Sequence, residues 1–471
     1  MKQNIIRVMI LAILIGLCIW QSITLWLGGS IPSHHFFAEN TISSENSYVR
    51  PKQIWSNING NIYRMNSNSI REKVLKELIM TLRQDRLNTN STPREEYAQL
   101  LFETQGLIFE FGTELTADEI IGQNIRTNQK YEAKPIKAIY VDLSSADTYK
   151  ISIYLVDATS QITQKITMNT ELKLENSVME LYKQKNEEAD ESSSKEDEAK
   201  VEKVYQASIL SSYDSEFFTG NVFYPKNNTQ YPMMRNKIRM KPIIENNQLE
   251  SRELENYVNS LFSSPLYIKS YKMDEGIAFS DNINLTVKYH NRGILEFEKT
   301  TLGTNQKLTK VQQMNCVQGF IDYTEAIPKE LKMNLYLTEI KEDQKTGEKV
   351  YLFGYRCHNG EIMILTNDAK RQLGINAVLE LRMKQGEVVK GKWLMLIPEE
   401  TQQYDVMTME SKQAIETIYE QNIQWEDDKS ELNDLTCAYV ISDFSKPAEF
   451  EWVGIYEKQQ ILVTKKNDSV E

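Results

Sequence analysis

The stretch "GIAFSDNINLTVKYHNRGILEFEKT", residues 276–300, indicates the fold class of this chain. Apolar and polar residues alternate along it in runs bounded by turn residues, which is typical of antiparallel strands with one buried face. The tetrapeptide "HNRG" at 290–293 supplies a turn, with Asn291 and Gly293 suited to positive φ. A helix is predicted over 249–262, just before the strands. The pattern therefore predicts a helix followed by an antiparallel meander.

The same order of elements recurs toward the C-terminus, at about 308–397 and 410–465. This recurrence predicts a weakly repeated helix-plus-meander module, with generic alternation of helices and strands as the alternative. Within the first recurrence, Tyr351, Phe353 and Tyr355 occupy alternate positions. Such spacing predicts one buried face of a strand, with a peptide- or glycan-binding surface as the alternative.

The part of the chain before residue 205 also combines helices with strands. Ser69 and Glu72 have the spacing of a capping box in front of a helical pattern. The stretch "TPREEYAQLLFE", 92–103, predicts a second helix that begins at Pro93. Strand-like runs follow at 107–111, 138–143, 149–157 and 162–168. Helices followed by a run of strands predict an α+β fold.

The chain begins with an apolar segment that contrasts with its polar remainder. No side chain from Val8 to Ser33 is charged, although the formal net charge of the whole chain is −12. The run 8–27 matches the roughly 20 residues that a helix needs to cross a bilayer. Because Lys2 and Arg7 precede it, the positive-inside rule predicts a single-pass cell-membrane protein with a cytoplasmic N-terminus and an extracytoplasmic bulk. A cleaved signal peptide and a lipoprotein anchor at Cys18 are the alternatives.

One face of the predicted transmembrane helix carries small residues. Ala12 and Gly16 have small-x-x-x-small spacing, and Ile19 and Ile23 extend the same stripe. Small residues allow two helices to approach closely in lipid, where packing drives association. These four residues form the candidate partner-binding face, with a lipid-facing stripe as the alternative.

A charged, Ser-rich stretch, "KNEEADESSSKEDEAKVEK", interrupts the chain at 185–203. It has too few apolar residues to form a core, so it is predicted to be a solvated loop or linker. The predicted organisation begins with a cytoplasmic terminus (1–7), a transmembrane helix (8–28) and a tether (29–48). A first α+β domain (49–184), an acidic loop or linker (185–204), a second helix-plus-meander domain (205–305) and a C-terminal α+β domain (306–471) follow.

The sequence contains no recognisable catalytic or nucleic-acid-binding motif. The acidic balance and the lack of a basic stripe argue against nucleic acid as a partner. There are 4 histidines and no H-E-x-x-H, P-loop or G-x-S-x-G motif, so no catalytic, cofactor or metal site is predicted. Cys316, Cys357 and Cys437 are far apart and are predicted to be buried and unpaired, with one disulfide among them as the alternative.

Several segments together resemble the YycH family of regulators of Gram-positive bacteria. In that family a helix ends in a Phe followed shortly by Pro, and a strand with a Ser/Thr-Asp step then leads to a hairpin that closes on an aromatic residue. The matching residues here are Phe262, Pro265, Ser280, Asp281 and Phe297. The other segments that carry the resemblance are "RPKQIWSNINGNIY" (50–63), "KVYLFGYRCHNGEIMI" (349–364) and "VLELRMKQGEVVKGKW" (378–393).

The resemblance implies regulation rather than catalysis. YycH-like proteins sit beside WalK, the sensor histidine kinase of the WalK–WalR cell-wall two-component system. They act through transmembrane and extracytoplasmic contacts with the kinase and with the similar single-pass protein YycI. The implied partners are therefore a WalK-type kinase and a YycI-like protein, and the implied C-terminal modules are YycI-like. A binding or inhibitory module for an exported protease and a cell-wall hydrolase are the alternatives, and the sign of the regulation stays open.

Overall fold

The computed structural model describes residues 48–58, 61–65, 67–83, 88–90, 97–125, 133–144, 150–169, 223, 233–244, 251–263, 267–300, 307–357, 360–407, 409–421, 432–456 and 459–463. These residues form a seven-stranded, a twelve-stranded and a two-stranded sheet, with helices packed on them. The fold is α+β, as predicted from the order of helix and strand patterns.

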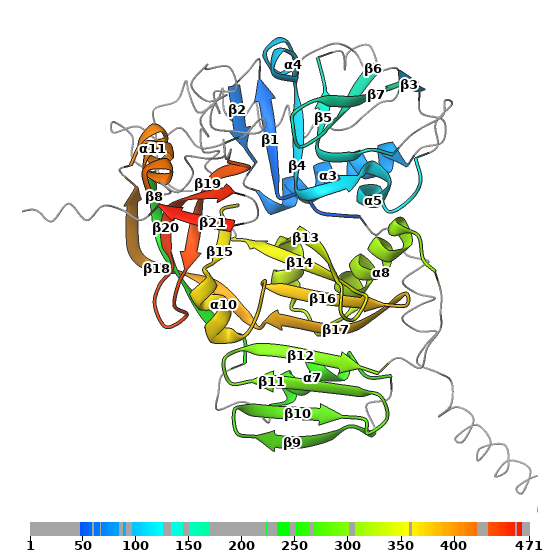
Figure 1. Cartoon of the computed structure of the whole chain (residues 1–471), viewed down its shortest axis with the longest axis vertical. Coiled ribbons are helices and arrows are strands. Elements are labelled where there is room, and N and C mark those ends of the chain that lie inside the picture. Colours follow the sequence, from blue (N-terminus) through cyan, green and yellow to red (C-terminus); the bar gives the residue numbers. More distant parts are fainter. Residues whose placement is uncertain are drawn as a thin grey trace, which may run out of the picture.

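The seven-stranded sheet, called here the first sheet, lies at the top of Figure 1. Its order is β2-β1-β4-β5-β6-β7-β3, and each strand runs antiparallel to its neighbours. Strands β4 to β7 lie where the four strand-like runs were predicted, and β4 extends further on both sides, whereas β1, β2 and β3 were not predicted. The elements are β1 (Gln53–Ile58), β2 (Asn61–Arg64), α3 (Asn68–Leu82), β3 (Asn88–Asn90), α4 (Tyr97–Glu103), β4 (Gln105–Thr116), α5 (Ala117–Ile121), β5 (Pro135–Asp142), β6 (Lys150–Val156) and β7 (Ile162–Asn169).

The predicted capping box at the start of α3 is wrong. The helix begins one residue before Ser69, and its N-cap residue Ser67 makes no side-chain cap hydrogen bond. The carboxylate of Glu72 instead accepts hydrogen bonds from the Tyr48 hydroxyl at 3.2 Å and from Nε of Arg50 at 3.1 Å. Tertiary partners therefore hold the side chain that the local rule assigned to the cap.

The twelve-stranded sheet, called here the large sheet, has the order β21-β20-β19-β15-β14-β16-β17-β12-β11-β10-β9, with β13 also paired to β14. Strands β15 and β19 run parallel, and the other pairs run antiparallel. The elements are α7 (Arg252–Asn259), β9 (Lys269–Met273), β10 (Gly276–Ser280), β11 (Leu285–His290), β12 (Ile294–Lys299), α8 (Lys310–Tyr323), α9 (Lys329–Asn334), β13 (Leu335–Asp343), β14 (Glu348–Arg356), β15 (Ile362–Leu365), α10 (Asn367–Leu373), β16 (Leu379–Lys384), β17 (Glu387–Leu394), α11 (Ser411–Gln421), β19 (Asp434–Ile441), β20 (Glu449–Tyr456) and β21 (Gln459–Val463).

The predicted meander forms β10 to β12, the unpredicted β9 pairs with β10, and the preceding helix is shorter than predicted. The Ser251 side chain caps α7 by accepting a hydrogen bond from the backbone N–H of Leu254. Gly293 adopts a φ of +75° in the turn between β11 and β12, and a Cβ there would lie 2.5 Å from Cδ2 of Leu396. Asn291 does not adopt positive φ, so only the glycine meets that expectation.

Strand β12 joins this meander to the rest of the large sheet by pairing with β17. Phe297 of β12 lies opposite Gly391, where a Cβ would lie 2.3 Å from the phenylalanine ring. The ring also stacks on Phe320 of α8, with centroids 5.4 Å apart, and meets the edge of Trp393 at 6.0 Å. The small residue thus leaves room for an aromatic core that spans both parts of the sheet. The predicted domain boundaries, including the one after residue 305, stay predictions.

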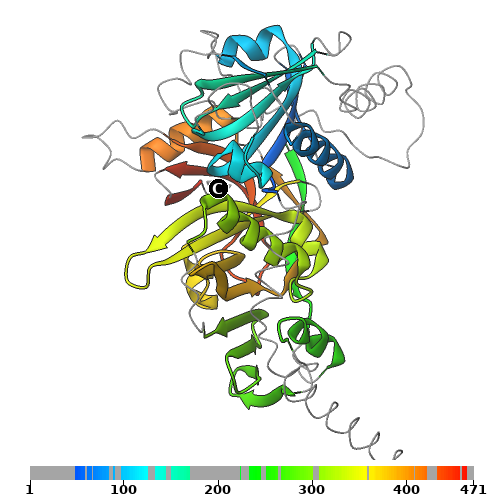
Figure 2. The ribbon, with the colours of Figure 1, turned by 90° about the vertical axis from the view of Figure 1, so that its right-hand side faces the viewer.

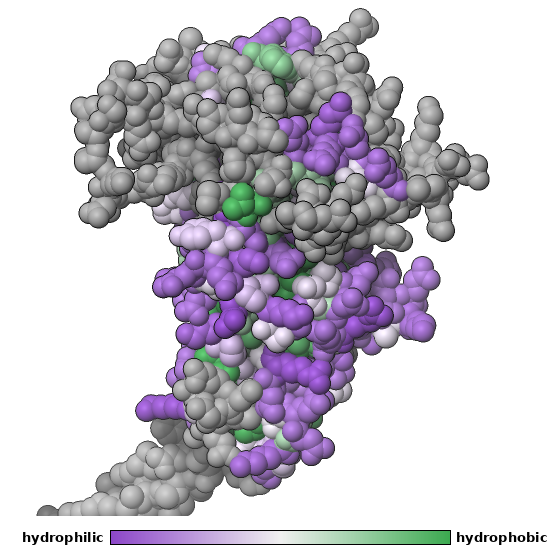
Figure 3. All heavy atoms as spheres, turned by 90° about the vertical axis from the view of Figure 1, so that its left-hand side faces the viewer, coloured by the Kyte–Doolittle hydropathy of each residue, from purple (hydrophilic) through white to green (hydrophobic). Residues whose placement is uncertain are grey.

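The remaining sheet is a ribbon of β8 (Met233–Pro242) and β18 (Leu396–Met407), which run antiparallel. Figures 1 and 2 show three tiers, with the first sheet at one end, β9 to β12 at the other, and the rest of the large sheet between them. On the face seen in Figure 3, the described side chains are mostly hydrophilic and the hydrophobic patches are small.

Two predictions about single residues of the large sheet are confirmed. Tyr351, Phe353 and Tyr355 of β14 are all buried, as their alternation indicated. The cysteines that the structure describes, Cys316, Cys357 and Cys437, are buried and form no disulfide.

Candidate functional site at the junction of the two sheets

The predicted partner-binding face of the transmembrane helix lies outside the described residues. Ala12, Gly16, Ile19 and Ile23 all fall within the undescribed first 47 positions. Among the described helices, none combines the length and the apolar character that a bilayer crossing needs. The site described below is a different one, formed where the first sheet meets the large sheet.

The two sheets approach closely where β4 lies against β13. Gly112 of β4 makes this approach feasible, because a Cβ at that position would lie 2.3 Å from the carbonyl oxygen of Leu337. The chain segment that leads into β1 reaches the large sheet at the same place, and Arg356 of β14 donates hydrogen bonds to the carbonyl oxygens of Pro51 and Lys52. We call this contact region the junction.

A buried lysine just before β1 links a strand of the first sheet to a strand of the large sheet on one side of the junction. Lys52 forms an ion pair with Asp434 of β19, and its Nζ lies 3.5 Å from a carboxylate oxygen of Glu110 in β4. The indole N–H of Trp55 donates to the other oxygen of Glu110 at 2.9 Å. Burial alone would lower the pKa of Lys52, but the two carboxylates outweigh it and raise the pKa. Lys52 is therefore held as a cation between two strands of different sheets.

A buried triad forms the other side of the junction. The Glu361 carboxylate, only 1% exposed, accepts hydrogen bonds from both terminal nitrogens of Arg64 in β2 at 2.5 Å and from Nε of Arg235 in β8 at 3.0 Å. Burial would raise the pKa of Glu361, but the two guanidinium groups outweigh it and hold the pKa below its usual value. Gln53 adds a hydrogen bond to the carbonyl oxygen of Gly360 at 2.9 Å.

Between the sheets lies a cleft of about 680 Å³, bordered by both. Its lining includes a small apolar cluster of the large sheet, to which Tyr336, Ile362 and Ile364 belong. Lys137 of β5 also lines it and donates to the carbonyl oxygen of Gly112 at 3.0 Å. Burial, and then the positive charge of Lys52, lower the pKa of Lys137. The cleft therefore combines an apolar patch with charged groups.

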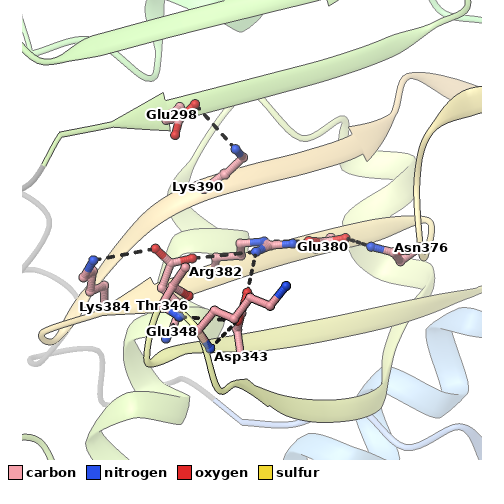
Figure 4. Close-up of polar contacts among 10 residues, drawn as sticks. Glu298, Asp343, Thr346, Glu348, Asn376, Glu380, Arg382, Lys384 and Lys390 are labelled. Atoms are coloured by element: carbon pink, nitrogen blue, oxygen red, sulfur yellow. Dashed lines mark hydrogen bonds and ion pairs between the residues drawn. The ribbon is translucent and has the colours of Figure 1, made fainter.

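A second group of charges covers the middle of the large sheet, shown in Figure 4. Arg382 of β16 bonds to Glu380 at 2.8 Å and approaches Asp343 at 3.4 Å and Glu348 at 3.7 Å. Lys390 of β17 lies 3.5 Å from Glu298 of β12. Opposite charges across neighbouring strands support the strand register. Because each of these carboxylates has a cationic partner, we assign this group a structural role.

The junction brings together charges that the sequence did not single out. The hydrogen-bonded pairs Lys52–Asp434 and Arg64–Glu361 are separated by 382 and 297 positions in the chain. No local sequence pattern indicates either pair, because the partners meet only through the packing of the two sheets. The described residues contain no group of three or more His, Cys, Asp and Glu side chains arranged to hold a metal ion.

Comparison with known proteins gives one informative match. No family model matches the sequence, and no curated protein matches it significantly. The crystal structure of YycH from Bacillus subtilis superposes with a TM-score of 0.53 at 13% sequence identity, covering 89% of this chain and 96% of that chain. The chain therefore has a YycH-like fold.

Proposed function

We propose that this chain is a membrane-anchored, extracytoplasmic regulator of a WalK-type sensor histidine kinase, and not an enzyme. The observation that carries the proposal is the YycH-like fold over 89% of the chain. The uncharged run from Val8 to Leu27 supports it, because a helix of this length would hold the folded part at the outer face of the membrane. A YycI-like single-pass protein is the second proposed partner.

Regulation of this kind requires the chain to bind two signalling states of the kinase unequally. A coupling free energy of about 1–3 kcal/mol would change the ratio of the two states by roughly 5–150-fold. The predicted helix face with Ala12 and Gly16 would supply the contact within the membrane. The described sheets would supply the extracytoplasmic contact.

The membrane contact can be tested by adding bulk to the small residues of the helix. In the double variant Ala12→Leu and Gly16→Leu, close helix approach is lost, so co-purification with the WalK-type kinase of the same genome should fall at least tenfold, the equivalent of about 1.4 kcal/mol. Quantitative mass spectrometry after crosslinking in membranes gives the measurement.

Cys18→Leu is the matched control, because it adds bulk outside the Ala12–Gly16 stripe of the predicted helix. This variant should co-purify with the kinase as well as the unchanged chain does. Equal recovery of the kinase with the double variant would contradict the helix contact. Capture of an exported protease in place of the kinase would contradict the proposed function itself.

A further inference from the structure

Two arginine side chains are enclosed in the junction without a carboxylate partner among the described residues. Arg71 of α3 and Arg356 at the end of β14 are each 3% exposed. Guanidinium groups stay protonated in proteins, and a buried charge without compensation is costly. The two side chains come from opposite sides of the junction, one from an element of the first sheet's layer and one from the large sheet.

The hydrogen-bond donors of these arginines are incompletely used. Arg356 donates through Nη1 to the carbonyl oxygens of Pro51 and Lys52, but its buried Nε has no acceptor. Arg71 donates through Nη1 to Oδ1 of Asn68 at a long 3.4 Å, while its buried Nε and Nη2 have no acceptor. Three nitrogen atoms, which carry four N–H groups on two cations, thus lack an acceptor, in a region where nearly every buried polar group is expected to have one.

Two carboxylates of the junction, Glu72 and Glu361, are already engaged by other cations. Glu72 follows Arg71 in the chain, but it accepts hydrogen bonds from Arg50 and Tyr48. Glu361 is bound by Arg64 and Arg235 in the triad described above. These carboxylates therefore leave the three nitrogen atoms without an anionic acceptor.

The pKa shifts of both arginines agree with this lack of an anionic acceptor. Burial, and then the positive charges of Arg356 and Arg64, lower the pKa of Arg71 well below its ordinary value. Burial is also the main cause that lowers the pKa of Arg356, to about 10. Since the guanidinium groups keep their protons, the surroundings call for additional negative charge.

The hydrogen-bonded neighbours fix both arginines in place. Asn68, which accepts from Arg71, donates to Oδ1 of Asn334 at 3.2 Å. Asn334 ends α9 and leads directly into β13, and the first residue of β13, Leu335, pairs with Tyr355, next to Arg356. A continuous path of contacts therefore connects the helix bearing Arg71 with the strand bearing Arg356.

We propose that Arg71 and Arg356 together bind a small inorganic monovalent anion of the size of chloride within the junction. The enclosure of both side chains excludes an anion that carries an organic tail. The three nitrogen atoms without an acceptor supply charge-assisted N–H hydrogen bonds to the anion. Bound there, the anion offsets the repulsion between two cations and links the layer of the first sheet to the large sheet.

The proposal is tested by thermal unfolding of the full chain in detergent. Sodium bromide or chloride is titrated against sodium gluconate at constant ionic strength, because gluconate is too large to enter the site. The unfolding midpoint should rise to a plateau with halide. Arg71→Gln should abolish this rise, whereas Arg371→Gln, at an arginine that is 79% exposed, should leave it unchanged.

Crystals of the unchanged chain grown in bromide give a test that does not depend on the folding of a variant. An anomalous peak within hydrogen-bond distance of both guanidinium groups is expected. Equal midpoints in halide and gluconate, a halide effect that survives Arg71→Gln, or the absence of a bromide peak at the pair would each overturn the proposal. In those cases water, and not an anion, accepts the hydrogen bonds.

Discussion

At the scale of single residues, the Glu361 carboxylate joins segments that are far apart in the chain. It accepts from Arg64 in the first sheet and from Arg235 in the β8–β18 ribbon, while its own position lies in the loop between β14 and β15. The ring of Phe450 lies 5.4 Å from the Arg235 guanidinium and covers it. Removing one partner of such a buried group leaves the others charged and unpaired.

Glu361→Gln should therefore lower the free energy of unfolding by about 3–5 kcal/mol at pH 7, because two arginines lose their counter-charge. Urea unfolding of the full chain gives the measurement. Glu399→Gln, which affects an exposed pair with Lys241, is the control and should change the free energy by under about 0.5 kcal/mol. A loss no larger than that of the control would contradict the role of the triad.

The loss of stability caused by Glu361→Gln should depend on pH. The pKa of Glu361 is held below its usual value in the folded state, so its stabilising effect is fully present above the unfolded-state pKa of about 4.3. Below that pH the unfolded chain takes up the proton first, and the stabilisation is lost as the pH falls toward the lower folded-state pKa. The difference in stability between the unchanged chain and Glu361→Gln should accordingly shrink below about pH 4.3.

At the scale of elements, the turn between β10 and β11 shows how the Ser-Asp step of the resemblance acts. Oδ1 of Asp281 accepts hydrogen bonds from the backbone N–H groups of Ile283, Asn284 and Leu285 at 2.9–3.0 Å. Oγ of Ser280 accepts from the N–H of Asn282 at 3.1 Å. One side chain thus organises the whole turn and fixes the register of the strands that follow.

Asp281→Ala should increase amide hydrogen exchange of Ile283, Asn284 and Leu285 by about tenfold or more, because their acceptor is removed and a charged-group hydrogen bond contributes about 1.5–3 kcal/mol. Asp281→Asn retains an oxygen acceptor and should increase exchange by a smaller factor. Exchange–mass spectrometry resolves this peptide. Unchanged exchange in the alanine variant would show that the turn does not depend on the carboxylate.

The helices and strands that could be predicted from the sequence are those that a local pattern of apolar and polar residues determines. Alternation located β4 to β7 and the meander, because a half-buried strand must alternate. The capping box at Ser69 failed since Glu72 finds tertiary partners in Tyr48 and Arg50. The junction could not be predicted, because the ion pairs that form it join residues hundreds of positions apart and depend on the packing of the two sheets.

At the scale of the whole molecule, one charged junction joins the first sheet to the large sheet. Lys52, the Glu361 triad and the proposed anion site all lie between the first sheet and the large sheet. A change in the relative position of these sheets would have to break or exchange buried charge contacts, which favours discrete states over gradual motion. The proposed regulatory function would use discrete states of this kind.

The most direct test of the regulatory role is the phosphorylation state of the WalK-type kinase in proteoliposomes, with and without the full chain. If the chain binds the two kinase states unequally, its addition should shift the ratio of phosphorylated to unphosphorylated kinase by roughly 5–150-fold. The variant with Ala12→Leu and Gly16→Leu should remove most of that shift. An identical ratio with and without the chain, at saturating amounts of the chain, would contradict the account.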